Sequence, residues 1–260
     1  MHPDYIAELL HPFTCPVSNP CHSESSQRVG EKPAVLSPAQ LQSISTYIDI
    51  LIHWNARINL TAIRNEEEIV TRHFGESLFA AHHLFPPCPE SSSVPPALKD
   101  LDLDFEVPQA QSPKAEARLA DLGSGAGFPG IPIKLWAPNI ALTLIESNQK
   151  KATFLRELTR ALTLTDIDIQ NARAETLPPS TFDVVTLRAV ERLPKVLPVA
   201  ANLLSPTGRL ALLISSSQRE STLSTLPNFS WDHPIPIPQS QSRIILVGSP
   251  EPRTPTGGMD

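Results

Sequence analysis

The sequence predicts an α/β fold in which a mostly parallel sheet is covered by helices on both faces and preceded by a small helical element. Between about residues 118 and 248, short apolar runs alternate with helical patterns. Residues 37–85 carry apolar side chains at helical spacing. A glycine-rich turn follows the first apolar run of the larger block, which is typical of open parallel sheets that bind a ligand beyond their strand ends.

The length and composition indicate one main domain. A chain of 260 residues can enclose one sizeable core and a small extra element. No stretch approaches the roughly 18 apolar residues of a transmembrane helix, and no basic-then-apolar leader opens the chain. Cys15, Cys21 and Cys88 are odd in number and lie outside the patterned regions, which suits free thiols in a reducing compartment. We therefore expect a cytoplasmic protein that does not contact membranes.

The helical element at residues 37–85 begins with a recognisable cap. Ser37 and Pro38 form an N-cap and first-turn pair, and apolar residues follow at helical spacing. A polar connection is expected at residues 55–64. Asn65 and Glu68 then predict a capping box that opens a second helix.

The larger block, residues 118–248, is expected to form the sheet. Its apolar runs are short and are separated by segments long enough for crossover helices, which favours parallel pairing. The polar, Pro-rich tract at 215–241 is expected to form loops and a short edge element. The predicted strands are 119–122, 142–146, 167–170, 182–187, 210–214 and 243–247, and the main predicted helices are 148–162 and 192–204.

Two acidic segments carry the whole net charge of −6. Residues 1–36 hold two basic and four acidic groups, and residues 86–117 hold two basic and six acidic groups. Both are rich in Pro and Ser, so they offer little apolar surface to offset the entropy of an ordered chain. We expect a disordered N-terminal extension at 1–36, a flexible insert at 86–117 and a disordered tail at 249–260. The remaining chain is neutral, so the net charge does not exclude a nucleic-acid partner.

The glycine-rich turn is the strongest functional signal. Gly123, Gly125 and Gly127 alternate along the chain, which lets the backbone turn tightly and approach a ligand closely. Glu146 ends the second apolar run, nineteen residues beyond Gly127. An open α/β sheet places a carboxylate at such a position to accept the hydroxyls of a ribose. A purely structural turn would leave this acid, and Asp121 before the turn, unexplained.

Two details favour S-adenosylmethionine over a dinucleotide. Asp121 lies two residues before the first glycine, where it suits a cationic amino group and would repel a pyrophosphate. The glycine spacing is also Gly-x-Gly-x-Gly, whereas a dinucleotide site requires Gly-x-Gly-x-x-Gly with the pyrophosphate at the helix N-terminus. We therefore predict a Rossmann-like, S-adenosylmethionine-dependent methyltransferase fold. No pattern of Cys or His with metal-ligand spacing is present, so no metal site is expected.

The chain resembles the bacterial small-subunit ribosomal RNA guanine-N7 methyltransferases, also called the glucose-inhibited division B family. The resemblance covers about residues 37–215 apart from the acidic insert. The Gly-Phe-Pro-Gly-Ile-Pro extension of the turn and the Arg-His pair before it are specific in combination. The matching stretches are Trp54-Asn55, Asn59-Leu60-Thr61, Arg72-His73, Glu76-Ser77, residues 121–132, Glu146-Ser147, Lys150-Lys151, Phe154-Leu155, Arg173 to Glu175, Phe182-Asp183 and Arg188-Ala189.

The resemblance implies a role for particular residues. Arg188, at the end of the fourth predicted strand, resembles the functional arginine of the family and is expected to act in catalysis and at the cofactor. The alternative for Arg188 is a salt bridge with Glu191, and for Arg72 and His73 it is a polar helix face or hydrogen bonds between helices. The implied substrate-binding residues are Arg72, His73 and Arg173, and the implied cofactor-binding residues are Asp121, Gly123, Gly125, Phe128, Glu146, Ala174, Glu175 and Arg188.

One position departs from the family pattern. Family members commonly carry Lys-Gly just after the fifth strand, whereas this chain reads Ile214-Ser215-Ser216-Ser217. A cation that could contact RNA phosphate is therefore missing from this loop.

The residue inventory fits methyl transfer to N7 of a guanine. That nitrogen carries a lone pair and no proton, so the reaction needs alignment and exclusion of water, not a general base. Methylation of a pyrimidine carbon would need a thiolate, and residues 118–248 contain no cysteine. The resemblance implies a monomer that acts on 16S ribosomal RNA or the small ribosomal subunit. A small-molecule methyltransferase and a non-catalytic cofactor-binding or RNA-binding module remain as alternatives.

Overall fold

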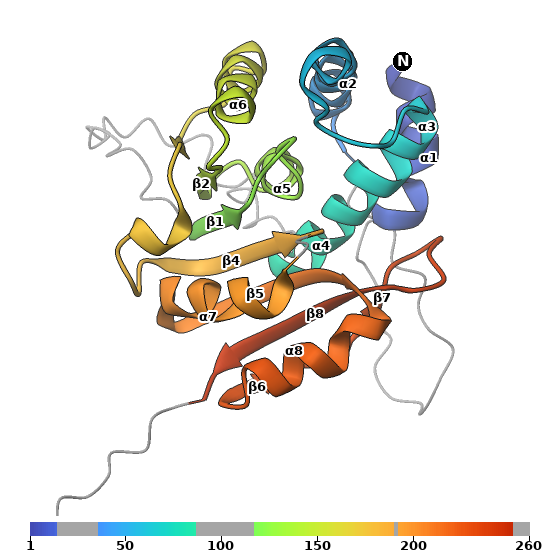
Figure 1. The fold of residues 1–260 in the computed structure, drawn as a ribbon. Coiled ribbons are helices and arrows are strands. Elements are labelled where there is room, and N and C mark those ends of the chain that lie inside the picture. Colours follow the sequence, from blue (N-terminus) through green and yellow to red (C-terminus); the bar gives the residue numbers. More distant parts are fainter. Residues whose placement is uncertain (15–35, 87–116, 190–191, 252–260) are drawn as a thin grey trace, which may run out of the picture.

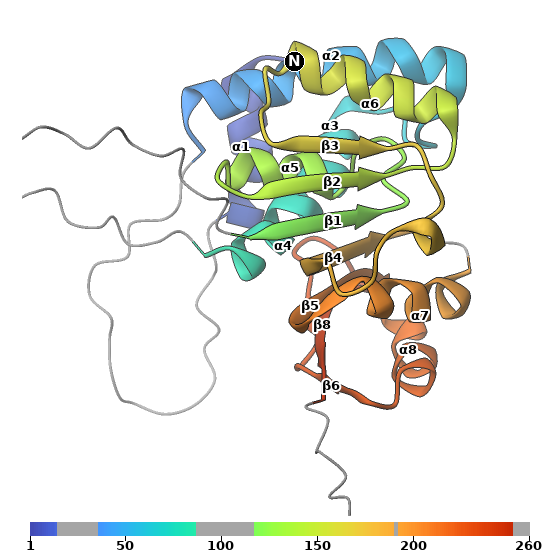
Figure 2. The same cartoon turned by 90° about the vertical axis from the view of Figure 1, so that its left-hand side faces the viewer.

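The structure, a computed structural model, describes residues 1–14, 36–86, 117–189 and 192–251. Eight strands form one sheet in the order β3-β2-β1-β4-β5-β8-β6, and β7 pairs with β8 (Figures 1 and 2). The predicted α/β class with a mostly parallel sheet is confirmed, because β1 to β5 are parallel and β8 runs antiparallel to β5. The strands are β1 (Arg118–Leu122), β2 (Ala141–Ile145), β3 (Ile167–Gln170), β4 (Phe182–Arg188), β5 (Leu204–Ser215), β6 (Phe229–Trp231), β7 (Ile235–Pro236) and β8 (Arg243–Pro250).

Helices cover both faces of the sheet (Figure 1). One face packs against α5 (Gly130–Trp136), α6 (Gln149–Ala161) and the N-terminal helices, whereas the other packs against α7 (Leu193–Leu203). Successive side chains of the central strands alternate between the two cores, as Leu119 and Ala120 do on β1. Burial on both faces explains why these strands read as continuous apolar runs.

The second N-terminal helix begins where its cap predicts. In α2 (Pro38–Ile58), Ser37 accepts a hydrogen bond from the backbone of Gln40, whose side chain accepts one from the backbone of Ser37. The helix runs to Ile58, so the connection that we expected at 55–64 is shorter. Asn65 caps the next helical run by accepting from the backbone N–H of Glu68.

That next run is not a uniform α-helix. It consists of α3 (Glu66–Glu68), a π-helical stretch η1 (Ile69–Gly75) and α4 (Glu76–Leu84). Stretches of π-helix are rare and occur frequently at functional sites. Here η1 contains both Arg72 and His73.

The expectation of a disordered extension at 1–36 is wrong for its first part. Residues Pro3–Thr14 form helix α1, which packs against α2, η1 and α4. Its buried side chains, Ile6, Leu10 and Phe13, follow one another at steps of four and three residues, so they line one helix face. The Pro- and Ser-rich remainder, 15–35, lies outside the described residues, as do 87–116 of the expected insert and 252–260 of the expected tail.

The C-terminal tract holds more structure than predicted. Residues 215–241 were expected to form loops and an edge element, but they also contain helix α8 (Arg219–Thr225) beside β6 and β7. A capping box between Ser215 and Gln218 precedes this helix. Thr222 is the one buried residue of α8, so the helix lacks the apolar stripe that would have revealed it.

Candidate functional site

The glycine-rich turn lies where the carboxyl ends of β1 and β2 meet. Gly123, Gly125 and Gly127 all have positive φ values, of 73°, 55° and 90°. The backbone N–H of Gly125 donates to Glu146 Oε2 over 2.9 Å, and that of Asn148 donates to Oε1 over 2.7 Å. The Glu146 carboxylate therefore holds the turn in place, a structural role beyond the predicted contact with a ribose.

Two of these glycines differ sharply in their surroundings. A methyl group built at Gly127 would lie 2.5 Å from the Tyr47 hydroxyl and 2.7 Å from Ile131, so protein atoms fill the space around this glycine. A methyl group built at Gly123 would have no neighbour within 4 Å. Gly123 therefore faces open space at the strand ends, as a residue that borders a ligand should.

Asp121 is buried beneath the turn. Its Oδ2 accepts from the backbone N–H of Gly130 over 3.2 Å, and its Oδ1 accepts from the Thr186 hydroxyl over 3.1 Å. Burial raises the pKa of Asp121 to about 6, and these hydrogen bonds together with the charge of Arg188 limit the rise. The carboxyl group is thus poised to change its charge just below neutral pH.

Phe128 joins the turn to the N-terminal helices. Its ring stacks on His73, with centroids 4.7 Å apart, and on Tyr47, with centroids 5.1 Å apart. The edge of Phe74 also meets Phe128. The resemblance implied that Phe128 lines a cofactor, but only 6% of this residue is exposed, because protein rings cover it.

Tyr47 ties α2 directly to the turn. Its hydroxyl donates to the carbonyl oxygen of Ala126, and burial raises its pKa well above 10, so it stays protonated as a donor. Nothing in the sequence patterns singled out Tyr47, because it occupies an ordinary core position of an amphipathic helix.

Arg188, at the end of β4, is held from three sides. Its Nε and Nη2 donate to Glu76 Oε2 over 3.3 and 3.0 Å. Its Nη1 donates to His73 Nδ1 over 2.7 Å. Its Nη2 also donates to the Arg72 carbonyl oxygen over 2.7 Å. The side chain is only 8% exposed. The alternative partner that we considered, Glu191, lies outside the described residues, and Glu76 is the acid that pairs with Arg188.

The hydrogen bonds of His73 define its protonation. Nδ1 accepts from Arg188, so Nε2 carries the proton and donates to Thr61 Oγ1 over 2.7 Å. Burial, reinforced by the charge of Arg188, lowers the pKa of His73 to about 3. His73 is therefore a neutral internal residue, and both ring nitrogens have protein partners.

Other predicted site residues lie at the end of β3. Ala174 and Glu175 begin a short 3-10 turn, η3 (Ala174–Thr176), and Arg173 directly precedes it with an exposed side chain. Asn171 donates to the carbonyl of Glu146, which fixes this loop against the end of β2. The turn η3 crosses towards α7, the helix after β4, and Ala174 packs against the core that contains Leu187.

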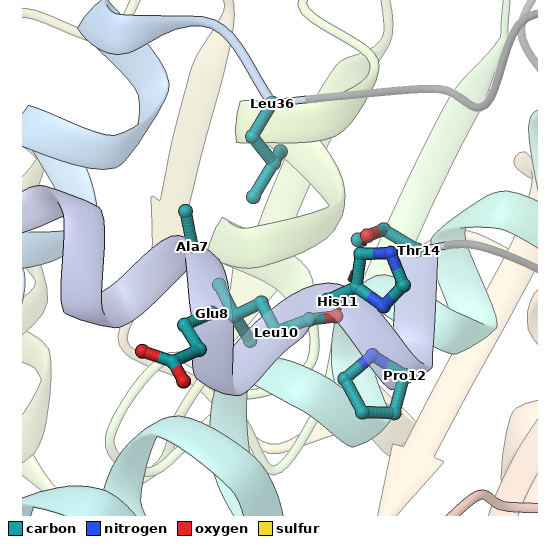
Figure 3. Close-up of a pocket in the computed structure, with 7 residues that line it drawn as sticks. All are labelled: Ala7, Glu8, Leu10, His11, Pro12, Thr14 and Leu36. Carbon is teal, nitrogen blue, oxygen red and sulfur yellow. Dashed lines mark hydrogen bonds between the residues drawn. The ribbon is translucent and has the colours of Figure 1, made fainter.

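A cavity of about 450 Å³ lies elsewhere, along α1 (Figure 3). Its lining combines apolar residues such as Leu10 and Leu36 with Glu8 and His11. The residues that line the cavity lie on α1 and at Leu36, and none of them belongs to the glycine-rich turn after β1. This cavity is therefore separate from the site at the glycine-rich turn.

The described residues contain no cluster of three or more His, Cys, Asp or Glu side chains that could hold a metal ion. None of the helices in the described ranges combines the length and apolar character needed to cross a bilayer.

Comparison with known proteins identifies the family. Residues 40–86 and 105–230 match the family described as rRNA small subunit methyltransferase G. The chain belongs to this family. A protein named ribosomal RNA small subunit methyltransferase G from Xylella fastidiosa is 33% identical over 204 residues, covering 77% of this chain and 82% of the relative. Its namesake from Bacillus subtilis is 32% identical over 238 residues, covering 86% and 88%.

A third relative of the same name, from Xanthomonas campestris, is 34% identical over 206 residues and covers 77% of this chain. The chain is thus an S-adenosylmethionine-dependent methyltransferase of Rossmann-like fold.

The family match ends at residue 230. Arg243, whose Nε lies 3.0 Å from Glu76 Oε2, is beyond that match. The sequence patterns gave no sign of this contact.

Proposed function

We propose that the protein transfers a methyl group from S-adenosylmethionine to N7 of a guanine in 16S ribosomal RNA. The observation that carries the proposal is the glycine-rich turn between Asp121 and Glu146, in a chain of the rRNA small subunit methyltransferase G family. The relatives are named for a ribosomal RNA substrate. The guanine N7 is the acceptor that best fits the chemistry of the site.

The residues at the turn suit the cofactor. The open space at Gly123 leaves room for a ligand against the backbone, and the buried Asp121 offers negative charge to a cationic amino group. Glu146 retains lone pairs for a ribose while it holds the turn. Ala174 and Glu175 at the end of β3 would contact the adenine. The cofactor supplies an electrophilic methyl group when it is bound.

Of the described residues in contact with Arg188, His73 is the imidazole that could act as a general base, and it has no free nitrogen. His73 is neutral, and its nitrogens are bound to Arg188 and Thr61. Methyl transfer to N7 requires no proton removal, so such a site is sufficient if it aligns the base and excludes water. The target guanine must leave its stack to reach the methyl group. Arg72 and Arg173, whose side chains are exposed, would contact RNA phosphates.

The direct test is to incubate the protein with methyl-labelled S-adenosylmethionine and either naked 16S ribosomal RNA or assembled small subunits. We expect label at N7 of one guanine, located by chemical cleavage at 7-methylguanine. Label on another position of the RNA would refute the assigned acceptor. Transfer only to small metabolites would favour the small-molecule alternative, and cofactor binding without transfer to any acceptor would indicate a binding module.

Replacing Gly123 with Ala should weaken cofactor binding more than it weakens the fold. A side chain at φ +73° costs about 1–2 kcal/mol, but it meets no protein atom, so the protein should still fold. The same methyl group would occupy the space proposed for the ligand, and we expect at least about a tenfold rise in the dissociation constant measured by calorimetry. Unchanged affinity would place the cofactor elsewhere.

Binding of S-adenosylmethionine should weaken as the pH falls through about 6. The pKa of Asp121 is about 6, so its ionised fraction drops roughly tenfold between pH 7 and pH 5. Because folding raises the pKa of Asp121, the protonated carboxyl group stabilises the folded state relative to the unfolded state. This stabilising contribution is greatest below about pH 4 and is lost as the pH rises through about 6. As the pH falls, the affinity for S-adenosylmethionine should therefore decrease while the contribution of Asp121 to stability increases. The Asp121→Asn variant should lose both of these pH dependences.

A further inference from the structure

Glu76 is the common partner of two arginines beside the proposed cofactor site. Its Oε2 receives Arg188 Nη2 over 3.0 Å and lies 3.0 Å from Arg243 Nε. The Glu76 side chain is only 4% exposed, so solvent hardly screens these charges. The three groups come from α4, β4 and β8, which are far apart in the sequence, so the contact is a product of the fold.

The charge balance around Glu76 is positive. Arg188 and Arg243 together carry two positive charges against one negative charge, and Arg72 adds a further positive charge that acts on both Arg188 and His73. An arginine cannot lose its proton in a protein, so these charges persist. Among the described residues, Glu76 is the acid in direct contact with Arg188 and Arg243, and it offsets part of their positive charge.

The field of Arg188 reaches the cofactor side of the site. Leu187 pairs with Leu122, so Arg188 ends β4 next to the point where Gly123 follows β1. The Arg188 guanidinium carbon lies 5.9 Å from the centre of the Phe128 ring in the glycine-rich turn. Arg188 also acts electrostatically on Asp121. A cation at the glycine-rich turn would therefore be repelled by Arg188 unless Glu76 compensated the charge of Arg188.

We propose that Glu76 is a positioning and specificity-determining residue that lets the site prefer the cationic methyl donor over its neutral product. The proposal rests on the proposed function, because S-adenosylmethionine carries a sulfonium charge that S-adenosylhomocysteine lacks. Glu76 offsets the charge of Arg188 and fixes its orientation through contacts to Nε and Nη2. After methyl transfer the cofactor has lost its positive charge, so the compensated site holds the product less strongly.

The decisive measurement is the ratio of the dissociation constants of S-adenosylmethionine and S-adenosylhomocysteine, determined by calorimetry at low salt. Glu76→Gln keeps the shape of the side chain and removes its charge. We expect this ratio to rise at least about fivefold, because the added positive field acts on the sulfonium but not on the thioether. A purely structural role would weaken both ligands equally and leave the ratio unchanged, which would overturn the proposal.

Neutralising a positive partner of Glu76 provides an independent check. Arg243→Gln removes one positive charge, so it should lower the ratio, and combining it with Glu76→Gln should return the ratio towards that of the wild type. Glu66→Gln is the matched control, because Glu66 is an exposed acid in the same helical run, and it should leave the ratio unchanged. A double variant whose ratio stays at that of Glu76→Gln would contradict the charge argument.

Two further outcomes separate this proposal from the function on which it rests. If the wild type binds neither ligand, the proposed function is wrong and the role of Glu76 falls with it. If the wild type methylates RNA but the ratio is insensitive to Glu76 and Arg243, only the role of Glu76 is wrong.

Should Glu76→Gln fail to fold, Arg243→Gln alone decides, because compensation requires it to lower the ratio. Glu76→Asp retains the charge but shortens the reach, so it should lower kcat while it preserves the ratio.

Discussion

Replacing Arg188 with Ala should reduce methyl transfer at least about tenfold and also destabilise the protein. The loss of transfer is expected because Arg188 ends β4 beside the glycine-rich turn, where the methyl group must meet its acceptor. The loss of stability is expected because the substitution leaves Glu76 buried with one cationic partner fewer. Breaking a buried ion pair from one side typically costs about 3–5 kcal/mol, and the remaining Arg243 should bring the cost towards the lower end.

Urea unfolding and single-turnover methyl transfer, both at a temperature where the variant is folded, would separate the two effects. Arg188→Lys tests geometry, because a lysine keeps the charge but cannot reach Glu76, His73 and the Arg72 carbonyl together. Arg118→Ala is the control, since Arg118 pairs with Asp183 at the surface and its loss should cost at most about 1 kcal/mol. Full activity of Arg188→Ala would show that Arg188 has no part in the reaction.

The sequence was sufficient to predict the central strands of the sheet and the glycine-rich turn. The buried central strands, such as β1 and β4, read as apolar runs, and the predicted bounds of β3 agree with the structure. The turn at Gly123 to Gly127 was predictable because positive φ values favour glycine. These features depend on local chemistry or on a period of a few residues, which a sequence displays directly.

The contacts of Arg188 could not be predicted in the same way. Glu76 and His73 precede Arg188 by 112 and 115 residues, so no local pattern links them to it. Only the folded sheet brings β4 against the π-helical stretch that carries His73. The motif Arg-His was visible, but its role as an internal partner, with Arg72 contributing a backbone carbonyl, required the three-dimensional arrangement.

The error at α1 had a different origin. The Pro and Ser of the later part dominate the overall composition of residues 1–36. They outweigh the apolar face formed by Ile6, Leu10 and Phe13. A helix of only 12 residues is marginal alone, so its stability must come from packing on α2, η1 and α4. Average composition does not register such a short amphipathic segment.

Phe13→Ala therefore provides the sharpest test of the N-terminal helix, and we expect it to lower the free energy of unfolding by about 3–5 kcal/mol. The Phe13 ring is buried against Gly75, where even an added methyl group would come within 2.7 Å of it. Tyr5→Phe on the same helix is the control, because Tyr5 is 41% exposed and loses only a hydrogen bond to Glu67, which should change stability by no more than about 0.5 kcal/mol. Urea unfolding would measure both.

The position of Phe13 also links this packing to the site. Gly75 ends the π-helical stretch that carries His73, and His73 in turn contacts Arg188 and Phe128. A cavity left by Phe13 would loosen this stretch, so we expect Phe13→Ala to weaken cofactor binding as well as stability, whereas Tyr5→Phe should alter neither. Equal stability of Phe13→Ala and the wild type would mean that α1 does not pack on the core. A stability loss with unchanged cofactor affinity would mean that the helix supports the fold without holding the site.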